Sequence, residues 1–223
     1  MRAAVEANLS KSAIDMPRFV WPAISDWLGG GDYYPVESAA GTLLTQDLDM
    51  YAGIDGFQKR LEKCVMRGIA SRIQWGDRDW HTFTLRKSRS SKRDTEIPKR
   101  LWQLAHRHEG YLYPHITVQA YMNEQRTSLL SVAVAYTHEL IPWAVKTFAS
   151  HRFHRVAYNS TGVWEKESRD LDGSWATFLA VDWDVYQTTG LFLKRWSYKD
   201  NIVLGEPMPQ FLDWVEKMEV TQV

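Results

Sequence analysis

The feature that most constrains the fold is a nearly continuous run of small apolar residues, LLSVAVAY, at 129–136. A strand that is covered on both faces has such a run, whereas a half-buried strand alternates apolar and polar residues. The segment before it, 115–121, does alternate, with Ile116, Val118 and Ala120 on one side. We therefore expect 129–136 to be a central strand of a layered α/β sheet, with 115–121 as a half-buried strand.

Helical patterns flank these two strands. The apolar face of the first begins after Thr95 as a candidate N-cap and ends at Gly110, and it contains Leu101, Leu104, Ala105 and His108. Thr137 can cap a second helix, whose expected buried stripe contains Leu140, Ile141, Val145 and Phe148. The predicted fold class is α/β, with a mixed central sheet flanked by helices.

The chain of 223 residues is long enough to bury a sizeable core, and no Pro/Gly/Ser-rich linker divides it. We expect one domain, 1–223. Its parts are an N-terminal arm at 1–35 with one short helix ended by glycines, a core at 36–148, and a C-terminal part at 149–223. The last part is expected to contain strands at 153–158 and 175–183 and a helix at 209–218.

The composition limits where the protein works and what attracts its partners. Net charge is zero, so any contact with nucleic acid must come from a local patch. Cys64 is the single cysteine, which fits a reducing compartment, and no secretory signal or membrane-length apolar segment is present. We expect a cytoplasmic protein without a membrane partner. Aromatic residues make up 13% of the chain; most are expected in the core, and some could offer surfaces for stacking.

Candidate chemistry centres on Asp55, which follows Gly53 and precedes Gly56 at the start of a predicted strand. Asp47, Asp49 and Glu37 lie upstream, the last on a helix expected over 37–50. Carboxylates that converge repel one another unless a cation neutralises them, and hard oxygen ligands select Mg²⁺ or Mn²⁺. Asp55 and Asp49 are the predicted metal ligands, at a site suited to phosphodiester hydrolysis. The alternative for Asp55 is a turn carboxylate in a hairpin.

The order of elements resembles the core of the PD-(D/E)xK nuclease superfamily. The resemblance lies in an acidic helix, then Gly53-Ile54-Asp55, then GIASRIQ at 68–74, and then the helix and two strands described above. It implies a restriction-endonuclease-like core over about 36–148. In that superfamily an Asp on one strand and a Glu or Gln, followed by a Lys, on the next hold the metal and the water. Asp55 matches the Asp, Gln74 the Glu or Gln, and Glu37 the carboxylate of the helix.

The chain departs from that pattern where the lysine is expected, because Gly76 stands there. The nearest cation on the predicted strand 69–75 is Arg72, which shares a face with Gln74. An arginine can stabilise a developing phosphorane but cannot act as a base. The lysine has therefore migrated, for example to Lys87, or catalysis has been lost. The alternative is that Arg72 and Gln74 are only surface partners across strands. The strands at 54–58, 69–75 and 82–86 are expected to form an antiparallel meander.

A basic stretch, RKSRSSKRDTEIPKR, runs from 86 to 100. Its cations and hydroxyls suit contact with the phosphate backbone, and the alternative is a solvated loop. The predicted nucleic-acid-binding residues are Arg86, Lys87, Arg89, Lys92 and Arg93.

The sequence thus predicts an Mg²⁺- or Mn²⁺-dependent nuclease, with DNA favoured over RNA and a homodimer allowed. The catalytic residues would be Asp55, Gln74, Arg72 and Glu37. The alternatives are a catalytically inactive module on the same fold that binds nucleic acid, and a phage or mobile-element factor that binds a host protein.

Overall fold

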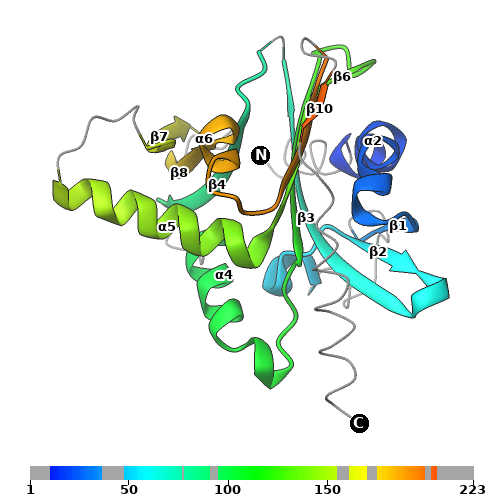
Figure 1. The fold of residues 1–223 in the computed structure, drawn as a ribbon, viewed down its shortest axis with the longest axis horizontal. Coiled ribbons are helices and arrows are strands. Elements are labelled where there is room, and N and C mark those ends of the chain that lie inside the picture. The colour runs from blue at the N-terminus through cyan, green and yellow to red at the C-terminus, as the bar shows by residue number, and fades with distance from the viewer. Residues whose placement is uncertain are drawn as a thin grey trace.

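The structure is a computed structural model (Figure 1). It describes residues 11–36, 48–76, 78–90, 95–154, 161–169, 175–198 and 202–204. This part of the chain forms a seven-stranded sheet and a three-stranded sheet. The strands of the larger sheet, in spatial order, are β1 (Asp32–Pro35), β2 (Gly56–Arg60), β3 (Val65–Trp75), β5 (Ile116–Met122), β6 (Leu129–Tyr136), β9 (Leu193–Ser197) and β10 (Ile202–Leu204). β3 and β5 are parallel, and the other neighbours are antiparallel, so the sheet is mixed as predicted.

The smaller sheet consists of β4 (Thr82–Arg89), β8 (Trp175–Asp182) and β7 (Val163–Arg169), all antiparallel. The predicted meander is therefore wrong at its third strand, because β4 pairs with β8 and not with β3. At Ile69, β3 already has Gly56 of β2 on one edge and Ile116 of β5 on the other. No edge is left there for a third strand.

Helices cover both faces of the larger sheet. On one side lie α4 (Glu96–Ala105), α5 (Thr137–His154), α6 (Trp183–Gln187) and the smaller sheet, and on the other lie the turns η1 (Met16–Val20), α2 (Trp21–Ile24) and η2 (Ser25–Leu28) (Figure 1). Short turns η3 (Leu48–Ala52), η4 (Leu61–Lys63) and η5 (Arg107–Glu109) connect elements. None of the helices in the described ranges has both the length and the apolar character needed to span a membrane.

The two central strands separate two apolar cores. On β6, Val132 and Val134 face the core with α2, while Ala133 and Ala135 face the core with α5; all four are 0% exposed. The prediction of a doubly covered strand at 129–136 is confirmed. The prediction for 115–121 is wrong, because β5 is buried along its whole length. Its polar face is covered and hydrogen-bonded.

The other predicted elements have mixed outcomes. α4 and α5 begin where expected, and Gly110 adopts the left-handed conformation (φ 82°) after η5. The N-terminal helical turns end at Gly29, also left-handed. β8 confirms the strand expected at 175–183, but 153–154 belong to α5 and not to a strand. The helix expected at 209–218 and all but the last residues of the one at 37–50 lie outside the described residues. β1, β7, β9 and β10 were not predicted.

Candidate functional site

Asp55 lies where β2 separates from β3. Its backbone N–H donates to the Ile69 carbonyl at 2.9 Å, and β2 begins at the next residue. Asp55 Oδ2 then accepts the backbone N–H of Ser71 at 2.5 Å and approaches Ser71 Oγ at 3.4 Å. The carboxylate thus takes the place of a strand carbonyl at the point where the ladder ends. This contact fixes the orientation of the partly buried Asp55 side chain relative to β3.

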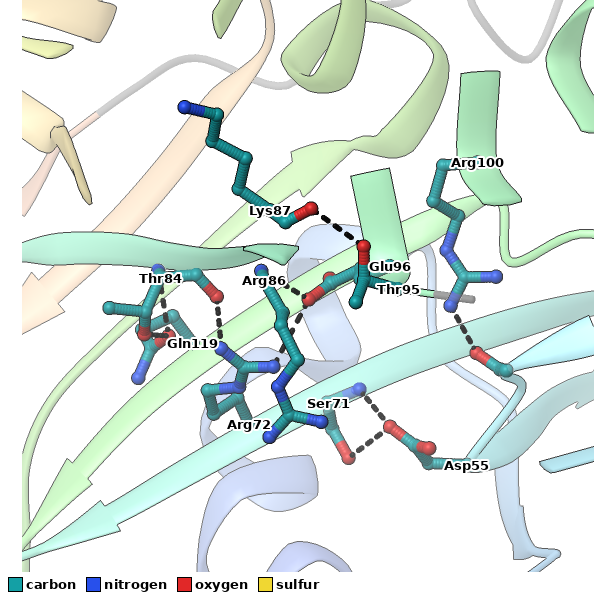
Figure 2. A network of polar contacts seen from close by, with 11 residues as sticks. Asp55, Ser71, Arg72, Thr84, Arg86, Lys87, Thr95, Glu96, Arg100 and Gln119 are labelled. Atoms are coloured by element: carbon teal, nitrogen blue, oxygen red, sulfur yellow. Dashed lines mark hydrogen bonds and ion pairs between the residues drawn. The ribbon is translucent and has the colours of Figure 1, made fainter. Parts of the chain in front are cut away.

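Arg72 points from β3 toward β4 and α4. Its guanidinium donates to the Thr84 carbonyl at 2.5 Å and to Glu96 at 3.0 Å (Figure 2). Gln74 follows on the same face and is also partly buried, opposite Tyr121 of β5. Asp55 and Arg72 therefore lie close to each other along β3 but have different partners. Asp55 accepts the backbone N–H of Ser71 on β3, whereas Arg72 donates to Thr84 of β4 and to Glu96 of α4.

Glu96, which the sequence analysis did not select, joins three elements. It is the first residue of α4, and its Oε2 accepts both Arg72 Nη2 and the backbone N–H of Arg86 at 2.9 Å. A carboxylate in the first turn also interacts favourably with the helix dipole. The available signal was the position of Glu96 directly after Thr95, a candidate N-cap. The Thr95 side chain does not cap the helix but donates to the Lys87 carbonyl at 2.6 Å.

Arg86 and Lys87, at the described start of the basic stretch, do not share one surface. Arg86 and Lys87 point to opposite sides of β4 (Figure 2). Lys87 Nζ forms an ion pair with Glu165 of β7 and lies 4.7 Å from the Phe148 ring centroid, on the side that faces α5. Arg86 instead points toward β3, with its Cζ 5.4 Å from the Phe178 ring centroid; Arg72 lies over the same ring at 5.3 Å.

A β-bulge between Arg86 and Ser88 changes the alternation of β4. Because of it, Arg86 and Arg89 stand opposite Phe178 and Ala176, which lie two residues apart on β8 and so share one face. Lys92 and Arg93 lie outside the described residues.

Arg100 and Gln103 of α4, which the sequence analysis also missed, hold the segment before Asp55. Arg100 of α4, 4% exposed, donates to the carbonyls of Ala52 and Gly53, the latter at 2.6 Å. Gln103 Oε1 accepts from Arg100 at 2.9 Å, while its amide donates to Ala52 at 3.2 Å. α4 thus positions the chain that leads into Asp55. Nothing in the periodicity of α4 distinguishes a buried arginine from the solvated cations around it.

The predicted metal ligands are only partly described. Asp49 lies in η3 without a described side chain, and Glu37 and Asp47 lie outside the described residues. Among the side chains that are described, no group of three or more His, Cys, Asp or Glu converges as a metal site would. Asp55 itself supplies oxygen ligands of the type that Mg²⁺ prefers.

Three of the described histidines, His81, His106 and His115, contact identified partners within the protein. His106 stacks on Trp102 with ring centroids 4.5 Å apart, and His81 Nε2 lies 2.8 Å from Asp79 Oδ2. Burial raises the pKa of Asp79, but its hydrogen bonds, chiefly those with His81, outweigh this effect. The pKa of Asp79 therefore lies below its ordinary value. His115 accepts the Gly68 N–H through Nδ1 at 3.2 Å; burial, then the nearby Arg67 and His138, lower its pKa to about 4.

Comparisons with known proteins add no family to this description. The chain matches no protein-family model, and neither the curated protein sequences nor the solved structures yield a match.

Proposed function

We propose that this protein is a metal-dependent nuclease that hydrolyses phosphodiester bonds, with Asp55 at the centre of its site. The observation that carries the proposal is the fixed Asp55 carboxylate at the β2–β3 junction, which accepts the backbone N–H of Ser71, the residue before Arg72 on β3. Arg86, from β4, points toward the same strand (Figure 2). An acid that can hold a hard cation and guanidiniums that can bind phosphate oxygens are the two components that this chemistry requires.

Each residue has a separate role in this proposal. Asp55 would hold Mg²⁺ or Mn²⁺, with Asp49 and Glu37 as further oxygen ligands. The bound cation would supply Lewis-acid activation of the phosphate and a more acidic water. Arg72 would stabilise negative charge that develops on the phosphate, and Gln74, on the same face of β3, would orient the water. DNA is the favoured substrate.

The element order supports a restriction-endonuclease-like core as part of this proposal. The antiparallel pair β2–β3 is followed by β4, α4, β5 and β6, in the order that the resemblance to the PD-(D/E)xK superfamily implies. The departure is β4, which belongs to the smaller sheet. It still contributes Arg86 to the surroundings of β3.

A second candidate function is a catalytically inactive module that binds nucleic acid, and three observations favour it. Glu96 neutralises Arg72. Gly76 stands where the superfamily has its lysine, and the amine of Lys87 pairs with Glu165. A protein of this kind would bind phosphodiester backbones without turnover.

Cleavage assays with a conservative variant separate the two candidates. Purified protein is incubated with Mg²⁺ or Mn²⁺ and with single-stranded, duplex and branched DNA and RNA. We expect cleavage that Asp55→Asn lowers at least about 100-fold, because the amide is a far poorer metal ligand. The amide oxygen of Asn can still accept the Ser71 N–H, so folding should persist. Asp32→Asn, a matched change on exposed β1, should cleave like the wild type.

Two results would count against the nuclease. Wild-type protein that leaves every substrate intact with both metals would exclude it and favour the inactive module. Full activity of Asp55→Asn would show that cleavage, where present, is centred elsewhere.

A further inference from the structure

One face of the smaller sheet gathers cations and aromatic rings. Arg86 of β4 stands opposite Phe178 of β8, and Phe178 stands opposite Lys166 of β7, so these three residues form one row across the sheet. Residues that are directly opposite in a ladder lie on the same face. Trp164 lies on this face too, two residues from Lys166 on β7.

Trp80, just before β4, extends this face and is 49% exposed. Lys166 Nζ lies 4.8 Å from the centroid of the Trp80 ring, and Arg78 Cζ lies 5.6 Å from it. Arg78 and Lys166 are themselves exposed. The aromatic surface is therefore bordered by two cations that water and ligands can reach.

The two faces of the smaller sheet carry different charged residues. Lys87 and Glu165 pair on the face toward α5, so an acid of β7 neutralises a cation of β4 there. The opposite face receives Arg86 and Lys166, and at its inner border Arg72 lies over Phe178 beside Arg86. The cation–aromatic face, defined here by Arg78, Trp80, Arg86, Trp164 and Lys166, therefore presents two exposed cations, Arg78 and Lys166, although the whole chain is neutral.

We propose that the cation–aromatic face binds an unpaired strand of nucleic acid. Single strands are bound by surfaces that combine cations for the backbone with exposed rings on which bases stack. In a duplex the bases are stacked inside the helix and cannot stack on exposed rings of the protein. The proposal rests on the proposed nuclease in one respect: a strand lying on this face would pass Arg86 and reach the Asp55 site. The preferred substrate would then contain a single-stranded segment.

Binding in EDTA tests this face without the metal or the cleavage step. Fluorescence anisotropy is measured with labelled 20-nucleotide oligothymidylate and with a duplex of the same length. We expect the single strand to bind at least tenfold more tightly. Trp80→Ala should weaken it roughly 5- to 100-fold, the usual effect of losing one stacking ring, and Trp80→Phe should restore most of the affinity.

Charge variants provide the matched comparison. Arg78→Gln with Lys166→Gln should reduce the slope of log K against log salt by about 1.4, since each phosphate contact on a single strand contributes about 0.7. Lys146→Gln with Arg107→Gln removes the same charge from exposed positions on α5 and η5 and should change nothing.

The outcomes separate this inference from the proposed function. Equal or tighter binding of the duplex, or wild-type affinity in Trp80→Ala, would overturn the inference. Competition by polyglutamate as effective as that by the oligonucleotide would overturn it in favour of an acidic protein partner. Tight single-strand binding without cleavage would exclude the nuclease but support the proposed binding face. Cleavage without such binding would support the nuclease but overturn the proposed binding face.

Discussion

Burial, together with the nearby charges of Arg67 and His138, favours the neutral form of His115. Its folded-state pKa of about 4 lies below the ordinary value of 6.5. Between these values the unfolded chain binds more protons than the folded one, so the free energy of unfolding falls as the pH falls from about 6.5 to about 4. At about 1.4 kcal/mol per pH unit, the loss reaches at most about 3 kcal/mol. Urea titrations at pH 7 and pH 4.5 measure it.

The matched variant for this prediction is His115→Gln. Its amide oxygen can accept the Gly68 N–H but does not titrate, so its stability should fall less between pH 7 and pH 4.5 than that of the wild type. Burial also lowers the pKa of His138, which contributes to both proteins in the same direction. Parallel pH profiles for the two proteins would show that His115 titrates normally.

At the level of single residues, the sequence analysis selected Asp55 as a candidate because two nearby glycines mark a change of backbone direction. It did not identify Glu96 or Arg100. Both lie in the basic stretch and on α4, where the sequence does not distinguish one polar residue from another. What distinguishes them is contact with Arg72 and with the carbonyls at 52–53, which only the tertiary fold brings close. Glu37, Asp47 and Asp49 remain predictions.

Among the elements, α4 and the segment before Asp55 are coupled by Arg100. Replacing Arg100 with Met leaves the buried carbonyls of Ala52 and Gly53 without this donor, at a cost of about 2–4 kcal/mol. We expect a lower urea midpoint together with faster hydrogen exchange at residues 48–56. Arg107→Met, an exposed cation of η5, should change the stability by less than about 0.5 kcal/mol. Similar effects of both substitutions would argue against the coupling.

Strand partners were harder to predict than the strands themselves. The patterns at 69–75 and 82–86 describe two half-buried strands but do not say that they pair. β5 shows the same limit: its Thr117 and Gln119 suggested a solvent face, yet both are buried, bonded to Thr137 and Thr84 respectively. Alternation in sequence reports which residues share a face and not what covers that face.

Across the whole molecule, the apolar run at 129–136 was informative because any layered sheet needs such a strand at its centre. The high aromatic content was less so, since it does not separate a core tryptophan such as Trp183, 1% exposed, from a surface one such as Trp80. Mixed α/β architecture was therefore predictable, and the division into two sheets was not.

The two apolar cores lie on opposite faces of the same strands, and this arrangement should make them unfold together. Ile24 and Leu140, one in each core, are both 0% exposed. Truncating either to Ala should cost about 2–5 kcal/mol. Because β5 and β6 contribute to both cores, losing one core removes a wall of the other. We expect Ile24→Ala and Leu140→Ala each to shift one common urea transition, with near-UV and far-UV circular dichroism superimposing. A biphasic curve in which each variant moves only one phase would show instead that the cores fold independently.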